Sequence, residues 1–174
     1  MIVPEKYKDA NIDNVPPVVR EAIRRLLKKE RGLYLFGAVG TGKTYIVWAI
    51  VNRLLKDFPQ FFPSSTIKIW NSLDLLDRIK TTFDNHQDEF VDELLDYKGI
   101  LVIDDIGVER PTPYATEQFY RLINRRYERG FTTFFTSNLP PKDLEDHLGY
   151  RTVSRIIESC DVIELSGKDK RLEQ

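Results

Sequence analysis

The stretch Gly37-Ala38-Val39-Gly40-Thr41-Gly42-Lys43-Thr44 decides how the rest of the chain is interpreted. It matches the pattern G-x-x-x-x-G-K-S/T in full, and an apolar run typical of a buried strand, LYLF at 33–36, precedes it. Glycines allow the backbone to curl so that its N–H groups surround an anion, and the positive end of the following helix adds to the attraction. In this pattern Lys43 reaches the β- and γ-phosphates of a nucleoside triphosphate and the Thr44 hydroxyl holds Mg²⁺. The alternative is a plain glycine-rich turn, but the flanking strand and helix favour the phosphate loop.

Helices and strands alternate on both sides of this loop. Apolar residues at helical spacing predict helices over about 17–31, 44–57, 72–83, 87–96, 113–129, 142–147 and 151–159. Short β-branched and aromatic runs predict strands at 33–36, 66–70, 100–103, 131–136 and 161–165. Gly32 is expected to follow the end of the first helix. The order predicts an α/β fold of three layers, in which a parallel five-stranded sheet carries helices on both faces.

The composition fits one globular domain spanning 1–174. The hydrophobic fraction is 41%, and 26 basic residues against 27 acidic ones give a net charge of −1, which argues against a protein that coats nucleic acid through its overall charge. Cys160 is the single cysteine, so a disulfide framework and a cysteine-based zinc site are excluded. The longest apolar run, 46–51, is too short for a membrane span, and the first residues lack the apolar core of a signal peptide. We therefore expect a cytoplasmic protein with no membrane partner.

Three further polar side chains are expected beside the phosphate loop. Asp104 follows four apolar residues at a strand end, where a nucleotide hydrolase places the carboxylate that helps to hold Mg²⁺. Asp105 is placed to polarise the attacking water, and Asn138, which ends the next strand, to orient it. Ligands of a parallel sheet bind at the carboxyl ends of its strands, so these residues and the loop should meet at one edge. Taken alone, Asp104 and Asp105 also fit a solvated acidic turn, and Asn138 fits an ordinary turn.

With these residues in place, the chain resembles the AAA+ ATPases, and more narrowly the ATPase domain of the bacterial replicative helicase loaders DnaC and DnaI, with the transposition ATPase IstB as a relative. The resemblance covers nearly the whole chain. The matching segments are VPEKYKDANIDNV (3–15), ILVIDDIGVERPT (100–112), FFTSNL (134–139), GYRTVSRI (149–156) and ELSGKDKR (164–171).

The resemblance implies an ATP-switched oligomer with Mg²⁺ as the metal. Lys43, Asp105 and Asn138 would act within one subunit, while Arg155 would complete the site of a neighbouring copy as an arginine finger. Arg151 is the other arginine of that motif, Arg171 is a candidate second sensor, and Tyr7 is a candidate adenine contact. Without the resemblance, Arg155 fits an ordinary surface helix arginine.

The implied function is slow ATP hydrolysis that loads or remodels the replicative DNA helicase, with weak single-stranded DNA binding through Arg78 and Lys80. The region 84–96 is acidic and should repel phosphates, so DNA contact is expected only from the helix before it. The basic first helix is a second candidate for DNA. The sequence also predicts three departures from the wider family: Asp105 in place of the usual glutamate, no carboxyl-terminal helical lid, and no separate amino-terminal helicase-binding domain.

Two other functions remain open at this point. One is a nucleotide-gated adaptor, similar to the IstB transposition ATPase, in which ATP drives assembly rather than turnover. The other is a small-molecule kinase, which shares the phosphate loop but needs an arginine-bearing lid that no segment clearly supplies.

Overall fold

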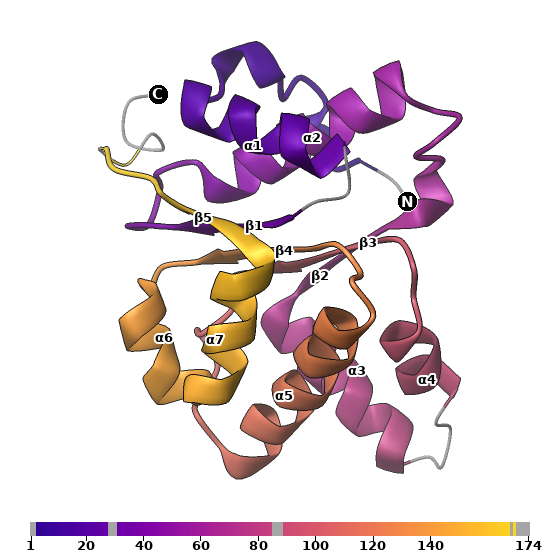
Figure 1. The fold of residues 1–174 in the computed structure, drawn as a ribbon, viewed down its shortest axis with the longest axis vertical. Helices are drawn as coiled ribbons and strands as arrows, with labels where there is room; N and C mark the ends of the chain where they lie inside the picture. Colours follow the sequence, from indigo (N-terminus) through magenta and orange to yellow (C-terminus); the bar gives the residue numbers. More distant parts are fainter. Residues whose placement is uncertain (1–2, 28–30, 85–88, 168, 170–174) are drawn as a thin grey trace.

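The computed structural model describes residues 3–27, 31–84, 89–167 and 169. Its centre is one five-stranded sheet, shown edge-on in Figure 1, in which all neighbouring strands pair in parallel in the order β2-β3-β4-β1-β5. The strands are β1 (Gly32–Phe36), β2 (Ile67–Asn71), β3 (Ile100–Asp104), β4 (Thr133–Ser137) and β5 (Cys160–Glu164). The α/β fold with a parallel five-stranded sheet and helices on both faces, as predicted from the sequence, is confirmed.

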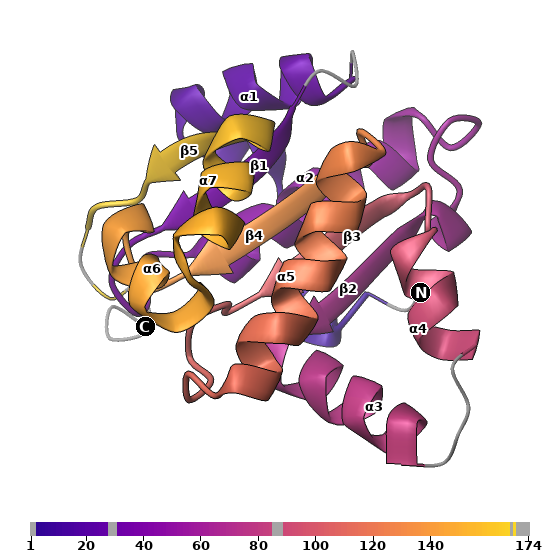
Figure 2. The same cartoon turned by 60° about the horizontal axis from the view of Figure 1, so that its bottom comes forward.

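Helices cover both faces of the sheet and make the outer two layers (Figure 1). One face carries α1 (Pro17–Leu27), α2 (Lys43–Asp57) and the short turns η1 (Glu5–Tyr7) and η2 (Ile12–Asn14). The other face, turned forward in Figure 2, carries α3 (Ser72–Asp84), α4 (Glu89–Leu95), α5 (Pro113–Glu128), α6 (Pro141–Leu148) and α7 (Tyr150–Ser159). A further turn, η3 (Ser64–Thr66), leads into β2. The two faces bury separate apolar clusters, which explains why the central strands read as continuous apolar runs.

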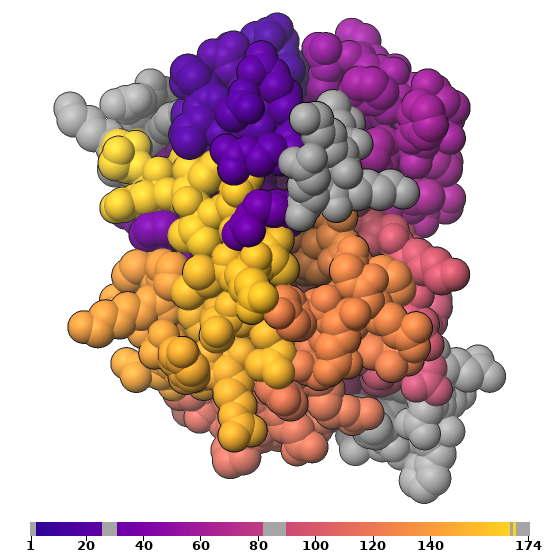
Figure 3. All heavy atoms as spheres, viewed as in Figure 1, coloured from indigo at the N-terminus to yellow at the C-terminus, as the bar shows by residue number. Residues whose placement is uncertain are grey.

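The amino-terminal helix docks beside the last strand of the sheet. Arg25 Nη1 donates to Asp161 Oδ1 at 3.1 Å, which joins α1 to β5, and the indigo and yellow segments adjoin on the face shown in Figure 3. Arg31 also pairs with Asp161, at 3.2 Å, so two of the basic residues of the predicted first helix have partners within the chain. Beyond Leu27 that predicted helix runs into 28–30, which lie outside the described residues.

Several boundaries differ from the sequence prediction by one or two residues, and two of these differences have a clear physical reason. Gly32 is the first residue of β1 rather than the end of a helix, because a Cβ there would lie 2.2 Å from the carbonyl oxygen of Thr133 on the neighbouring strand. Strand β4 begins at Thr133 rather than at 131, because Phe131 N donates to Arg126 O at 2.9 Å and so belongs to the turn that ends α5.

All five strands run in the same direction, so their carboxyl ends form one edge of the sheet. The glycine-rich loop after β1, the acidic turn after β3 and the 137–138 segment after β4 lie along it. After β5, the described residues 165–167 and 169 contain no helix. Within the described part of the chain, no helix has the length and apolar character that a membrane crossing requires.

Candidate nucleotide-binding site

The glycine-rich loop adopts the backbone conformation that only glycine accepts easily. Gly37, Gly40 and Gly42 have φ values of 145°, 79° and 95°. Gly42 is the residue before α2, and its carbonyl oxygen accepts from Ile46 N at 2.9 Å, so the helix begins directly at the loop. The positive end of a 15-residue helix therefore faces the loop, which is the arrangement that attracts phosphate.

Lys43 is folded onto the loop that carries it. Its ammonium group donates to Gly37 O at 2.7 Å, to Ala38 O at 2.9 Å and to Asn138 Oδ1 at 2.8 Å. The residue is 5% exposed, so its charge is held inside the site by these acceptors. The contact with Asn138 brings together two predicted site residues, one from the start of α2 and one that directly follows β4.

Thr44 and Asp104 also meet, as predicted. The Thr44 hydroxyl lies 3.2 Å and 3.1 Å from the two carboxylate oxygens of Asp104, and Thr136 Oγ1 donates to Asp104 Oδ1 at 2.5 Å. Burial raises the pKa of the Asp104 carboxyl, and the charge of Asp105 adds to the rise, while Thr136, Thr44 and Lys43 oppose it. A hydroxyl and a carboxylate are hard oxygen donors of the kind that Mg²⁺ prefers.

Asp105 has an unusual backbone conformation. Its φ is +58°, the only positive value at a non-glycine position among the described residues. The backbone is tied on both sides: Asp105 N donates to Thr136 Oγ1, and Ser72 Oγ donates to Asp105 O, each at 2.9 Å. Such a conformation persists only where the surroundings fix it, and it is typical of functional sites.

A family model described as AFG1-like ATPase matches residues 4–174. The chain belongs to the AFG1-like ATPase family. The replicative helicase loader DnaI of Bacillus subtilis (strain 168) is 29% identical over 163 residues, which are 82% of this chain and 48% of DnaI. The chain spans about half the length of the curated relatives it matches.

Solved structures agree with this assignment. The match to a crystal structure of DnaI covers 98% of this chain and 95% of the DnaI chain at 27% identity, with a TM-score of 0.76. The match to a crystal structure of the DnaC helicase loader covers 94% of this chain and 100% of the DnaC chain at 23% identity. Its TM-score of 0.79 shows that the two chains share a fold. The resemblance to the helicase loaders that was inferred from the sequence motifs is therefore confirmed.

The amino-terminal segment of this AFG1-like ATPase packs on α2 just after the phosphate loop. Tyr7 stacks on Trp48, with ring centroids 5.8 Å apart and an interplanar angle of 14°. Asn52 Nδ2 donates to Tyr7 O at 2.9 Å, and Asn11 N donates to Tyr45 OH at 3.1 Å. These contacts place Tyr7, the predicted adenine-contacting residue, with its ring face against Trp48, which lies one helical turn after Thr44 on α2.

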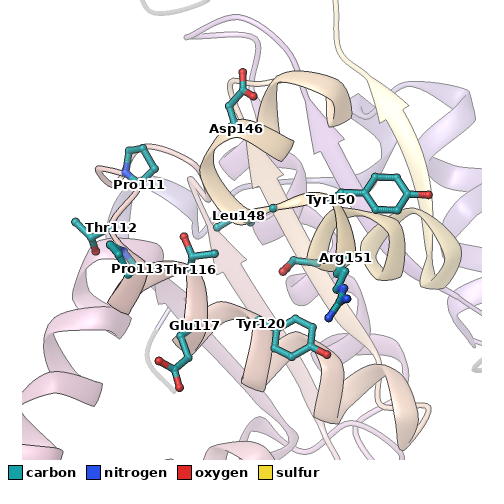
Figure 4. Close-up of a pocket in the computed structure, with 12 residues that line it drawn as sticks. Pro111, Thr112, Pro113, Thr116, Glu117, Tyr120, Asp146, Leu148, Tyr150 and Arg151 are labelled. Carbon is teal, nitrogen blue, oxygen red and sulfur yellow. The ribbon is translucent and has the colours of Figure 1, made fainter.

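Arg155 lies on α7 and contacts α5 rather than the loop residues. Its guanidinium group lies 5.3 Å from the ring centroid of Tyr120 and 5.8 Å from that of Tyr127, and Nη1 donates to Arg151 O at 2.9 Å. Arg151 is exposed and lines a pocket of about 730 Å³ between the start of α5 and the α6–α7 junction, together with Tyr150 (Figure 4). The predicted second sensor, Arg171, lies outside the described residues.

The two predicted DNA-contacting residues do not share a face of α3. Arg78 and Lys80 are both exposed, but they are two positions apart on the helix, and residues at that spacing point in different directions. Arg78 lies over the ring of Phe90, 5.3 Å from its centroid.

Sequence reasoning missed three residues of the site. Thr136 bridges Asp104 and Asp105, and Ser72 and Glu109 contact the acidic turn from the other side. The segments that contain Thr136 and Glu109 had been singled out, but which of their hydroxyl or carboxyl groups turns inward depends on tertiary packing. Ser72 was predicted only as the first residue of the helix over 72–83.

Proposed function

We propose that this chain binds MgATP, hydrolyses it slowly in an assembly of several copies, and uses that cycle to load or remodel the replicative DNA helicase. The observation that carries the proposal is the convergence of Lys43, Thr44, Asp104 and Asn138, from three strand ends, into one connected cluster. A plain glycine-rich turn needs no such cluster.

The residues present fit a triphosphate and Mg²⁺. The loop offers backbone N–H groups at the start of α2, Lys43 supplies a positive charge, and Thr44 with Asp104 supplies the oxygen donors. Bound Mg²⁺ would neutralise charge on the β- and γ-phosphates. When ATP binds, Lys43 would leave the carbonyl oxygens of Gly37 and Ala38 and donate to phosphate oxygens instead. It would also leave Asn138 Oδ1, which could then accept a different hydrogen bond.

Asp105 and Asn138 are proposed to act on the attacking water. Asp105 accepts a hydrogen bond from the water and Asn138 orients it, while Arg155 of a neighbouring copy neutralises the charge that develops on the transferred phosphoryl group. The contacts of Arg155 with Tyr120 and Tyr127 support a role outside its own site, because they direct it toward α5.

The replicative helicase is proposed as the partner because of the proteins that this chain is similar to. Two of the matched relatives, at 29% and 28% identity, are described as replicative helicase loaders. Weak binding of single-stranded DNA through α3 belongs to the same proposal. Because Arg78 and Lys80 diverge on the helix, each would contact phosphate separately, and a low affinity with strong salt dependence is expected.

Calorimetry and co-purification test the proposal together. We expect the parent chain to bind ATP in a Mg²⁺-dependent manner and Lys43→Ala to lose most of that affinity, while Arg129→Ala, an exposed arginine after α5, binds as the parent does. In extract, the parent with a non-hydrolysable ATP analogue should retain a replicative DNA helicase. Absence of MgATP binding would contradict the whole proposal, whereas binding without helicase recovery would contradict only the partner.

A second function, the nucleotide-gated adaptor, is favoured by one observation. The catalytic carboxylate is an aspartate on a backbone held at φ +58°, so its reach toward a water is short and fixed. An Asp105→Asn variant separates the two functions. If it abolishes turnover yet preserves ATP-dependent assembly and helicase recovery, ATP acts as a gate; if recovery is also lost, hydrolysis drives the work.

A further inference from the structure

A buried carboxylate, Glu109, closes the acidic turn that follows β3. It is 4% exposed, and Gly107 N donates to its two oxygens at 3.0 Å and 3.1 Å. Ser72 Oγ lies 3.0 Å from Glu109 Oε2. Burying a carboxylate costs free energy, so a position that retains one needs a reason beyond the turn itself.

Ser72 connects this carboxylate to Asp105. Ser72 is completely buried at the start of α3, and its hydroxyl lies 2.9 Å from Asp105 O and 3.0 Å from Glu109 Oε2. A serine hydroxyl carries one hydrogen, and both neighbours are acceptors, so that hydrogen is shared between them and anchors the hydroxyl to both. The carbonyl of Asp105 and the carboxylate of Glu109 are thereby linked through one hydroxyl group.

The linked carbonyl belongs to the residue with the strained backbone. The φ of +58° at Asp105 is unfavourable for a non-glycine residue, and hydrogen bonds at its N–H, to Thr136, and at its C=O, from Ser72, hold it there. Rotation of this peptide would swing the Asp105 side chain, whereas the carboxylate of Asp104 is held by hydrogen bonds from the hydroxyls of Thr44 and Thr136.

We propose that Ser72 and Glu109 are positioning residues that fix the direction of the Asp105 carboxylate, and that this inference rests on the proposed ATPase function. Neither residue touches the nucleotide. Glu109 holds the Ser72 hydroxyl in place, and that hydroxyl holds the Asp105 carbonyl. They therefore govern the rate of hydrolysis and leave nucleotide binding unchanged.

Steady-state kinetics of four variants test the assignment. In Ser72→Ala and Glu109→Ala, kcat should fall about 10- to 100-fold, the effect of misplacing a catalytic group by about 1 Å, with KM within about twofold of the parent. Glu109→Gln should retain most of kcat, because its carbonyl oxygen accepts from Gly107 N and its amide donates to Ser72 Oγ, which frees the hydroxyl hydrogen for Asp105 O. Glu128→Gln, an exposed acid at the end of α5, is the control that leaves kcat unchanged.

A double-mutant cycle separates positioning from general stabilisation. If Ser72 acts through Asp105, then adding Ser72→Ala to Asp105→Asn leaves the small residual kcat of that variant, measured at high enzyme concentration, unchanged. Equal kcat values for parent and Ser72→Ala, a parallel loss of affinity and kcat, or a full Ser72→Ala effect in the Asp105→Asn background would each overturn the inference. These results differ from failure of the proposed function, in which the parent itself neither binds nor hydrolyses ATP. Should Glu109→Ala not fold, Ser72→Ala and the cycle decide the question.

Discussion

The partly buried carboxylate of Asp104 destabilises the fold when it is ionised, and it is also the proposed ligand of Mg²⁺. Burial raises the pKa of its carboxyl although two threonine hydroxyls donate to it. A group whose pKa is raised by folding stabilises the fold while it is protonated, and that stabilisation is lost as the pH rises through the folded pKa. At neutral pH the ionised carboxylate therefore lowers the free energy of unfolding, and a charged oxygen at this position fits the proposed role of Asp104 in holding Mg²⁺.

Replacing Asp104 by asparagine should separate the two effects. We expect Asp104→Asn to melt at or above the temperature of the parent near pH 7.5, by roughly 2–4 °C, the shift that about 1 kcal/mol produces in a domain of this size. The difference should narrow as the pH is lowered, because the parent carboxyl, whose pKa is raised by burial, then takes up its proton. Differential scanning fluorimetry measures this, with Asp143→Asn, an exposed acid in α6, as the control.

The same variant should lose the Mg²⁺ dependence of ATP binding. If Asp104→Asn melts well below the parent at neutral pH, the carboxylate is stabilising and the electrostatic argument is wrong. If Mg²⁺ still strengthens ATP binding to the variant, the metal is held elsewhere.

Residues with a fixed place in a local pattern were predictable from the sequence. Lys43 and Thr44 follow from the glycine-rich motif, and Asp104 follows from its position at the end of an apolar strand. Ser72 and Glu109 were not predictable, because a serine before a helix and a glutamate after a turn are each common on a surface. Only the packing of α3 against the acidic turn places them inside.

At the scale of elements, Arg126 ties α5 to the amino-terminal edge of the sheet. Its guanidinium group donates to Tyr97 O at 2.7 Å, to Gly99 O at 2.9 Å, to Thr132 O at 2.8 Å and to Thr133 Oγ1 at 2.8 Å. Arg126 is 1% exposed, and burial lowers its pKa to about 10. Three of the acceptors precede β3 or β4 and the fourth, Thr133, is the first residue of β4, so one side chain fixes the start of both strands.

Arg126→Ala should destabilise the fold strongly. Each buried acceptor left without a donor costs roughly 1–3 kcal/mol, so we expect the free energy of unfolding to fall by about 3 kcal/mol or more. Chemical denaturation provides the measurement. Arg129→Ala, an exposed arginine just after the same helix, should change stability by less than about 0.5 kcal/mol. A small effect of Arg126→Ala would mean that water replaces the guanidinium group.

Elements were predictable where their signals were local and strong. The helix predicted over 113–129 begins at Pro113, and Thr112 caps it by accepting from Ala115 N at 3.1 Å, which is the chemistry that a Thr-Pro pair favours at a helix start. Gly32 was misinterpreted because a glycine after a basic helical segment has the same local pattern as a helix end. Its actual role depends on the close approach of Thr133, a residue 101 positions later in the chain.

At the scale of the whole molecule, the proposed site is built from one edge of the sheet, and Arg155 belongs to a different surface. Its helix, α7, packs on α5, and its guanidinium group lies over the rings of Tyr120 and Tyr127. An arginine finger contributes roughly 10³ to 10⁵ in rate, so a subunit without a neighbour should hydrolyse ATP slowly. A head-to-tail contact, in which α7 of one copy meets the phosphate loop of the next, satisfies this requirement.

Mixing two inactive variants tests whether Arg155 acts in a neighbouring copy. Arg155→Ala retains its own Asp105 but offers no finger, and Asp105→Asn offers a finger but cannot orient water. In an equimolar mixture, about one contact in four joins an intact site to an intact finger, so turnover should recover to about a quarter of the parent value if contacts form at random. Arg121→Ala, an exposed arginine on α5, is the control that behaves as the parent.

The recovery of turnover in the mixture should depend on the protein concentration. Because the active unit is a contact between copies, turnover per chain in the mixture should rise with protein concentration, as it should for the parent alone. A mixture that stays as inactive as its components would place Arg155 in its own site or outside catalysis. Recovery that is independent of concentration would instead indicate copies that exchange but stay fully assembled throughout the range tested, a result that keeps the neighbouring-copy role.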